Sequence, residues 1–255
     1  MAFRTNLTSQ EDTLCNMPAP LHPVSLNPVR TMKRWTSLGR ALATGIALVV
    51  CLGGILYWRP LWVIEESARA WLRLAGVRSE YVQLGPFRIH YLVGGRGQPL
   101  VLVHGLDGNA ENWVGLMPAL MRHGHRVYAI DLLGFGRSDR PDVDYSIALQ
   151  ADVLNQFFDS QNLPRADLGG WSMGGWVALK FALDHPERLR RIFVADSAGM
   201  NFHLPFDPTL FELVTVDRAQ QLLALLTPQG SLIPRFVARD AVRRMGPMRW
   251  VVGVP

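Results

Sequence analysis

Gly-Gly-Trp-Ser-Met-Gly-Gly occupies residues 169–175, and its central five residues fit the pattern Gly-x-Ser-x-Gly. This pattern places a serine on a sharp turn between a strand and a helix. The serine backbone is strained there, and the crossing elements leave no room for a side chain at Gly170 or Gly174. Residues 165–169 have the pattern of a strand that enters such a turn, and residues 176–183 have that of a helix that leaves it. An inert serine in a glycine-rich turn is the alternative, but this context favours Ser172 as a nucleophile.

A second loop follows another predicted strand. Residues 100–103, Leu-Val-Leu-Val, suit a strand that is buried on both faces, and they lead directly into His104, Gly105 and Leu106. We predict that the backbone amides of Leu106 and Met173 form an oxyanion hole, which stabilises the charge that develops in acyl transfer. His104 lies too close to the strand end to act as the general base, and we interpret it as a residue that shapes the loop through hydrogen bonds.

Two further segments complete a series of four motifs, namely Asp-Leu-Leu-Gly-Phe-Gly-Arg-Ser-Asp at residues 131–139 and Asp-His-Pro-Glu-Arg-Leu at residues 184–189. In this order the motifs resemble the α/β-hydrolase family of the lipase and esterase type, from about Tyr81 onward. The resemblance implies that Ser138 is structural and that His185 ends a helix. It also implies hydrolysis without a metal or a cofactor, and the serine at the nucleophile position argues against the family members that use aspartate, such as haloalkane dehalogenases and epoxide hydrolases.

The apolar runs predict six strands of a mostly parallel sheet, where this fold has eight: residues 81–84, 88–93, 100–103, 126–130, 166–168 and 191–195. In the family, the acid and the histidine of the triad follow the nucleophile, after the late strands. The chain reaches Pro255 with no further strand pair and no late histidine. We therefore expect a C-terminally truncated sequence, with an incomplete hydrolase core at residues 80–199 and a partial helical cap at residues 200–255.

Two residues are candidates for the missing partners of the serine. Asp196 follows the last predicted strand, where some lipases of this fold place the acid, although an aspartate there also caps a turn. His203 is the only later histidine, and nothing fixes its geometry toward Ser172. The general-base histidine is therefore predicted to be absent from the chain, which as written is expected to be inactive or nearly so.

The N-terminal part predicts a membrane anchor. Residues 41–58 are uncharged and lie between Arg40 and Arg59, and at about 1.5 Å per residue they span roughly 27 Å, enough for the hydrocarbon core of a bilayer. Tyr57 and Trp58 lie where interfacial aromatic residues occur. A cleaved signal peptide is the alternative, but forty residues precede the run and no Ala-x-Ala site follows it directly. The run therefore predicts a single transmembrane signal anchor.

The flanking segments differ in character. Residues 1–40 are predicted to be a disordered basic tail. Residues 59–79 predict an amphipathic juxtamembrane helix, which can lie in the membrane interface or pack on the hydrolase body. Basic residues are balanced on the two sides of the anchor, and those nearest to it slightly favour a periplasmic or extracellular hydrolase domain.

Charge and motifs exclude several classes of partner. Residues 1–60 carry six Lys or Arg and two Asp or Glu, which gives +4 of the total formal charge of +5. The basic character therefore indicates attraction to anionic lipid headgroups, not a nucleic-acid surface. The sequence has no zinc-like spacing of cysteine and histidine, no phosphate loop and no dinucleotide fingerprint.

Apolar side chains are frequent in the predicted cap, where residues 216–226 and 233–245 predict helices: Phe202, Leu204, Phe206, Leu210, Phe211, Leu222, Leu223, Leu225 and Leu226. Together with the anchor they favour lipid-like or other apolar acyl esters, such as monoacylglycerols, as substrates, although leucines at helical spacing also form the core of a cap. The predicted function is ester hydrolysis through an acyl-enzyme at Ser172. The alternatives are a thioesterase, a carbon–carbon bond hydrolase or an acyltransferase of the same fold, or a catalytically inactive membrane-tethered binding protein.

Overall fold

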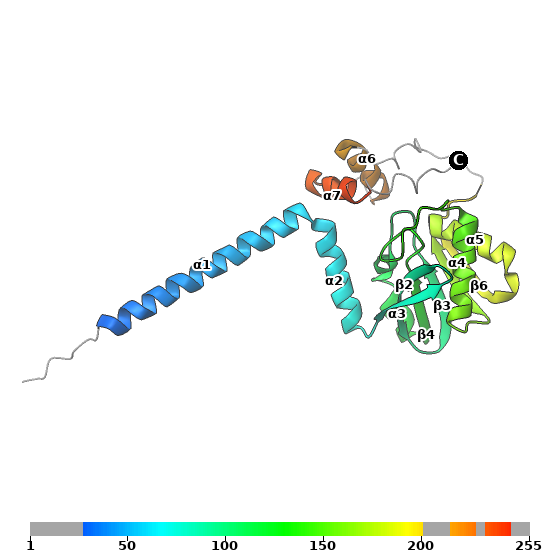
Figure 1. Cartoon of the computed structure of the whole chain (residues 1–255), viewed down its shortest axis with the longest axis horizontal. Coiled ribbons are helices and arrows are strands. Elements are labelled where there is room, and N and C mark those ends of the chain that lie inside the picture. Colours follow the sequence, from blue (N-terminus) through cyan, green and yellow to red (C-terminus); the bar gives the residue numbers. More distant parts are fainter. Residues whose placement is uncertain (1–27, 201–214, 228–232, 246–255) are drawn as a thin grey trace, which may run out of the picture. The chain divides into compact units, whose positions relative to one another are not determined.

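The computed structural model describes residues 28–200, 215–227 and 233–245. The chain divides into two compact units, residues 1–50 and 51–255. The described part of the first unit is a stretch of helix α1 (Pro28–Trp58), and the second unit begins with the end of that helix and with α2 (Pro60–Leu74) (Figure 1).

Helix α1 is long and apolar enough over Gly39–Trp58 to cross a membrane, and none of this stretch is buried in the protein. A helix that is apolar on all sides and not buried suits a bilayer. The helix begins at Pro28, earlier than predicted. Residues 28–40 were assigned to a disordered tail, and this assignment is wrong. Six of these thirteen residues are Arg, Lys, Met or Leu, which are good helix formers, and proline is favourable in a first helical turn.

All six predicted strands are present and form one mixed sheet with the order β1-β2-β4-β3-β5-β6. Strand β2 is antiparallel to both of its neighbours, while β3 is parallel to β4 and β5, and β5 is parallel to β6. Five of the strands therefore run in one direction. The strands are β1 (Arg78–Leu84), β2 (Phe87–Gly95), β3 (Gln98–Val103), β4 (His125–Ile130), β5 (Ala166–Trp171) and β6 (Leu189–Ala195).

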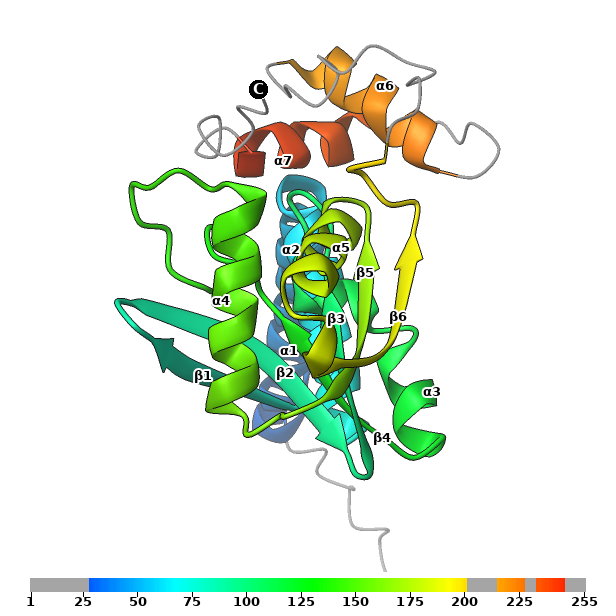
Figure 2. The ribbon, with the colours of Figure 1, turned by 90° about the vertical axis from the view of Figure 1, so that its right-hand side faces the viewer.

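Helices cover both faces of the sheet (Figure 2). Helices α4 (Ile147–Ser160) and α5 (Met173–Asp184) pack on one face, and α2, α3 (Met117–Arg122) and the short turn η1 (Ala110–Trp113) pack on the other. A second short turn, η2 (Pro186–Arg188), leads from α5 into β6. Because both faces are covered, the four residues at the end of β3 are fully buried, as their continuous apolar sequence predicts.

Helices α6 (Val216–Leu226) and α7 (Arg235–Met245) pack on each other through Ala219, Leu222, Ala238 and Ala241. Helix α6 has the predicted bounds, and α7 begins two residues later than predicted, directly after Pro234. Leu225 and Leu226 of α6 are more than half exposed. The other predicted cap residues, Phe202, His203, Leu204, Phe206, Leu210 and Phe211, lie outside the described residues.

Replacement of Gly174 tests how closely α5 approaches the sheet. A Cβ atom at Gly174 would collide with the carbonyl oxygens of Val103 and His104, which are backbone atoms that cannot give way. We expect Gly174→Ala to lower the free energy of unfolding by about 2–3 kcal/mol, as measured by urea unfolding in detergent. A Cβ atom at Gly115 meets nothing within 4 Å, so Gly115→Ala is the control. Equal stability of the two variants would contradict this packing.

Candidate active site

Ser172 lies at the sharp junction of β5 and α5. Its φ of 55° and ψ of −122° place it in a region that non-glycine residues rarely adopt. Its amide donates to the carbonyl oxygen of Ala195 at 3.0 Å, and its own carbonyl accepts from the amides of Gly175 and Ala198 at 2.9 and 3.1 Å. These bonds hold the strained turn in place, which is the condition under which such strain persists in a folded protein.

The predicted glycine requirement has a direct structural cause. A Cβ atom at Gly170 would collide with the backbone of Gly174 and Gly175, and one at Gly174 would meet the end of β3. The turn therefore reaches the sheet only because both positions lack side chains. This close approach brings Ser172 next to the loop that follows β3.

The loop after β3 lies beside the serine. A Cβ atom built on Gly105 would be 3.1 Å from Cβ of Ser172. Within the described part of the chain, the amides of Leu106 and Met173 have no protein acceptor, and the hydroxyl of Ser172 has no hydrogen-bond partner. Two unpaired backbone donors flanking a serine are the arrangement that an oxyanion hole requires.

His104 is fully buried, and both of its ring nitrogens are occupied. Nε2 accepts from the amide of Leu132 at 3.0 Å, so Nδ1 carries the proton and donates to the carbonyl oxygen of Gly105 at 2.7 Å. Burial lowers the pKa of His104, and the nearby charge of Asp131 offsets this only in part. A neutral imidazole with both nitrogens in use orders the loop and is not available to take a proton from Ser172.

Asp131, which follows β4, binds three surrounding groups. Its Oδ1 accepts from the amide of Ala110 at 2.6 Å, and its Oδ2 lies 2.8 Å from the amide of Arg137 and 2.7 Å from Nδ1 of His90. Burial alone raises the pKa of the Asp131 carboxyl, but the hydrogen bonds from His90 and from the amide of Arg137 help to hold it below its usual value. Ser138 donates to the Asp131 carbonyl at 2.7 Å, which is a structural contact. This role of Asp131 was not predicted from the sequence because two of its three partners, Ala110 and His90, lie 21 and 41 positions away.

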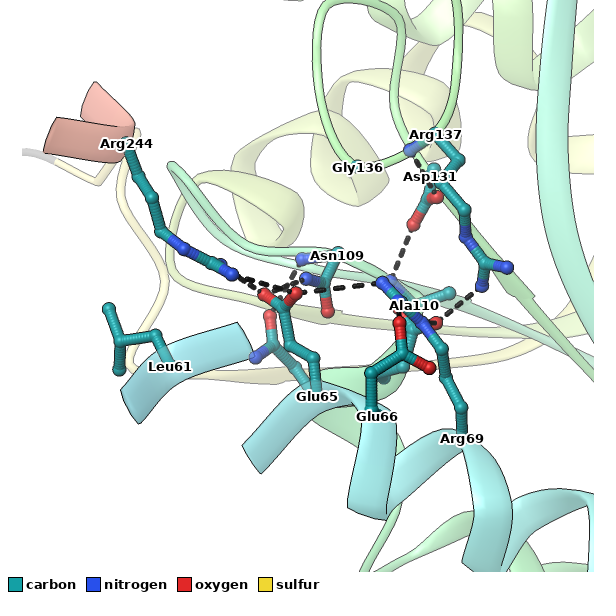
Figure 3. A network of polar contacts seen from close by, with 12 residues as sticks. Leu61, Glu65, Glu66, Arg69, Asn109, Ala110, Asp131, Gly136, Arg137 and Arg244 are labelled. Carbon is teal, nitrogen blue, oxygen red and sulfur yellow. Dashed lines mark hydrogen bonds and ion pairs between the residues drawn. The ribbon is translucent and has the colours of Figure 1, made fainter. Parts of the chain in front are cut away.

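A polar network joins α2 to the loop after β3 and to α7 (Figure 3). Glu65 of α2 accepts from Nδ2 of Asn109 at 3.0 Å and from Nη2 of Arg244 at 3.1 Å. The Asp240 carboxylate of α7 accepts from the amide of Leu61 at 3.1 Å. The predicted juxtamembrane helix therefore contacts both the loop that carries Leu106 and the described part of the cap.

A second set of ion pairs in this network centres on Glu111, which is 4% exposed. Nε of Arg69 donates to Oε1 of Glu111 at 2.8 Å, and the guanidinium of Arg137 donates to the same oxygen. Helix α2 is thereby connected to the loop after β4 through one buried carboxylate. No sequence signal identified these pairs, because the three residues lie 26 to 68 positions apart.

The remaining candidates lie apart from this centre or outside the described residues. Asp196 directly follows β6, is exposed and has a φ of 45°, and among the described residues it has no hydrogen bond or ion pair with a histidine. His203 is not described. Over residues 39–200, 215–227 and 233–244, no group of three or more His, Cys, Asp or Glu side chains is arranged to hold a metal ion.

Asp107, next to Leu106, is a partly buried carboxyl with a φ of 55°. Burial, together with the charge of Glu65, raises its pKa to about 6, against the lowering effect of Arg244 and Arg140. Because the pKa is raised, the native state holds this proton more tightly than the unfolded state. The contribution of Asp107 to stability is therefore lost as the pH rises through about 6.

Asp107→Asn removes this titration. The free energy of unfolding of the variant, relative to that of the unmodified protein, should be about 1–2 kcal/mol higher at pH 7.5 than at pH 4.5. This value is reduced because the carboxyl is partly exposed. Urea unfolding at the two pH values measures the difference. Asp152→Asn, on the exposed side of α4, is the matched control and should show no such gain. The same response in both variants would rule out burial of Asp107 as the cause.

Glu65→Gln tests the network at α2. It keeps the shape of the side chain but removes the charge that the Arg244 guanidinium binds. We therefore expect the free energy of unfolding, measured with urea, to fall by about 1–2 kcal/mol. The control is Glu66→Gln, because Glu66 pairs with Arg69 alone and its side chain is 38% exposed, against 20% for Glu65. An equal loss in both variants would mean that the contacts of Glu65 with Asn109 and Arg244 contribute little.

Two known proteins with similar sequences are named as hydrolases. The 2-hydroxy-6-oxo-6-(2'-aminophenyl)hexa-2,4-dienoic acid hydrolase of Metapseudomonas resinovorans is 33% identical over 205 residues, which cover 74% of this chain and 68% of the relative. The 2-hydroxymuconate semialdehyde hydrolase of Pseudomonas sp. strain CF600 is 35% identical over 181 residues, which cover 63% of this chain and 64% of the relative. The matched region thus spans about two thirds of each relative.

Solved structures give the same result. The crystal structure of a membrane phospholipase A, described as a bacterial virulence factor, superposes with a TM-score of 0.63 and 27% identity, over 84% of this chain and 73% of that chain.

A family model for the alpha/beta hydrolase fold matches residues 98–229, about half of the chain. Together with the six-stranded sheet and the strained serine turn after β5, these matches show that the chain belongs to the α/β-hydrolase fold family.

Proposed function

We propose that this protein is a serine hydrolase that forms an acyl-enzyme at Ser172. The observation that carries the proposal is the strained serine, with a φ of 55°, beside the unpaired amides of Leu106 and Met173. The serine oxygen attacks the carbonyl carbon of an ester, and the two amides stabilise the resulting oxyanion. The alcohol leaves, and water then releases the acid from the serine.

Ser172 needs a base to accept its proton. His104 is committed to the loop, and within the described residues no side chain is hydrogen-bonded to the Ser172 hydroxyl. We therefore propose that residues 1–255 alone acylate slowly and turn over little. Asp196 is our candidate for the orienting acid, because Ala195 directly before it accepts a hydrogen bond from the Ser172 amide and the two loops adjoin.

Apolar acyl esters are the proposed substrates, and membrane lipid is the proposed partner of α1. The uninterrupted apolar stretch of α1, the exposed Leu225 and Leu226 of α6, and the similarity to a membrane phospholipase A support this assignment. We propose one membrane span, with the hydrolase domain on the periplasmic or extracellular side. The proposed mechanism uses neither a metal nor a cofactor.

The two sequence relatives support a second candidate. Both are named as hydrolases of unsaturated 2-hydroxy acids or semialdehydes. A carbon–carbon bond hydrolase of this kind would use the same oxyanion donors on a charged, water-soluble substrate. The two candidates therefore differ in whether an apolar chain or a carboxylate must be bound.

A fluorophosphonate probe tests the nucleophile. The full chain in detergent should be modified at Ser172, the only serine in the tryptic peptide 166–180, and Ser172→Ala should lose this modification completely. Mass spectrometry of the peptide measures the extent of modification over time, with heat-unfolded protein as the background. If the folded protein reacts no faster than the unfolded protein, the catalytic proposal fails and a tethered binding protein is favoured.

The substrate class is tested by a single acylation event, which does not require turnover. We expect p-nitrophenyl decanoate to release p-nitrophenol in a Ser172-dependent burst at least tenfold faster than p-nitrophenyl acetate does, because an apolar chain gains binding energy in an apolar site. Equal rates, together with cleavage of a 2-hydroxy-6-oxo-dienoic acid, would favour the second candidate.

A further inference from the structure

A second chain of Ser, His and Asp side chains lies outside the Ser172 site. Oγ of Ser79 is 2.9 Å from Nε2 of His90, and Nδ1 of His90 is 2.7 Å from Oδ2 of Asp131. His90 and Asp131 have no exposed surface, whereas Ser79 is exposed on β1, an edge strand that pairs only with β2. A buried imidazole therefore faces a hydroxyl that solvent molecules can reach.

The direction of these hydrogen bonds follows from Asp131. Backbone amides of Ala110 and Arg137 donate to its carboxylate, which favours the ionised form. An ionised carboxylate only accepts, so Nδ1 of His90 carries the proton and donates to it. In the neutral imidazole, Nε2 then accepts the hydroxyl proton of Ser79. This is the orientation in which a histidine activates a serine.

Arg137 places a positive charge beside the same hydroxyl. Its Nη1 donates to Oγ of Ser79 at 3.2 Å, and its Nη2 pairs with the buried Glu111. The guanidinium is therefore held in place from two sides. A fixed cation next to the serine oxygen favours the negative charge that develops on the substrate oxygen and on Oγ during attack.

We propose that Ser79 is a second activated serine, a site that is acylated by small activated aryl esters and phosphonylated, with loss of fluoride, by small fluorophosphonates. With an aryl ester, Oγ of Ser79 attacks the carbonyl carbon and its proton passes to Nε2 of His90. The bond to the aryl oxygen then breaks, and the phenol leaves with that proton. The product is an acyl ester on Ser79, which persists until water hydrolyses it. The proposal does not depend on acylation of Ser172.

Peptide mapping separates the two serines. Ser79 is the only serine in the tryptic peptide 79–88, so its modification is read independently of the peptide that contains Ser172. Ser67, an exposed serine of α2 whose hydroxyl donates to the carbonyl of Val63 at 2.8 Å, is the internal control. With a small fluorophosphonate and the full chain in detergent, we expect Ser79 to react at least tenfold faster than Ser67, in the unmodified protein and in Ser172→Ala alike.

His90→Asn tests the relay itself. The asparagine amide keeps a donor near Asp131 but removes Nε2, so modification of Ser79 should fall at least tenfold while near-ultraviolet circular dichroism stays native. If this variant does not fold, Arg137→Gln provides the second test, with an expected fall of about threefold. The proposal is wrong if Ser79 reacts no faster than Ser67 in the folded protein, or if a folded variant at either position leaves the rate unchanged. A lack of modification at Ser172 alone does not contradict the proposal for Ser79.

Discussion

One buried carboxylate, that of Asp131, holds together the loops from which the candidate active site is built. It accepts from the amides of Ala110 and Arg137 and from the imidazole of His90, so it connects the loop after β3, the loop after β4 and strand β2. Removal of this carboxylate would leave buried donors without a partner, which costs more than the loss of an exposed ion pair. The loop after β3, which lies beside Ser172, is ordered in part by this connection.

Features encoded by neighbouring residues were predictable from the sequence. The six strands, the serine turn and α6 follow from apolar periodicity and from glycine spacing, because these patterns act over a few residues. The contacts of Glu65 with Asn109 and Arg244 span 44 and 179 positions, and the sequence gives no sign of them. The relay from Ser79 to Asp131 was missed for the same reason, since a polar side chain reveals nothing about its partner until the fold brings them together. The helical start at Pro28 was missed because prolines and low periodicity earlier in the tail outweighed the helix formers that follow.

Helix α2 packs on the hydrolase body, which is one of the two roles that the sequence left undecided. Leu72 is buried against the hydrolase core, while Ile64, Trp71 and Leu74 on the other side are 59% to 84% exposed. Polar contacts from the packed side reach the loop after β3 and helix α7. The exposed apolar side chains therefore lie away from the polar contacts that join α2 to the loop after β3.

The two serine environments have different features of a serine hydrolase site. Ser172 has backbone strain and two unpaired amides, but in the described residues it has no base. Ser79 has a base, a carboxylate and a cation, but lies exposed on an edge strand. Stabilisation of the oxyanion in a water-excluded site is usually the largest contribution to catalysis, and activation of the nucleophile contributes less. Under our proposals, Ser172 is for this reason the position suited to repeated turnover once a base is supplied, whereas the Ser79 environment favours a single acylation event.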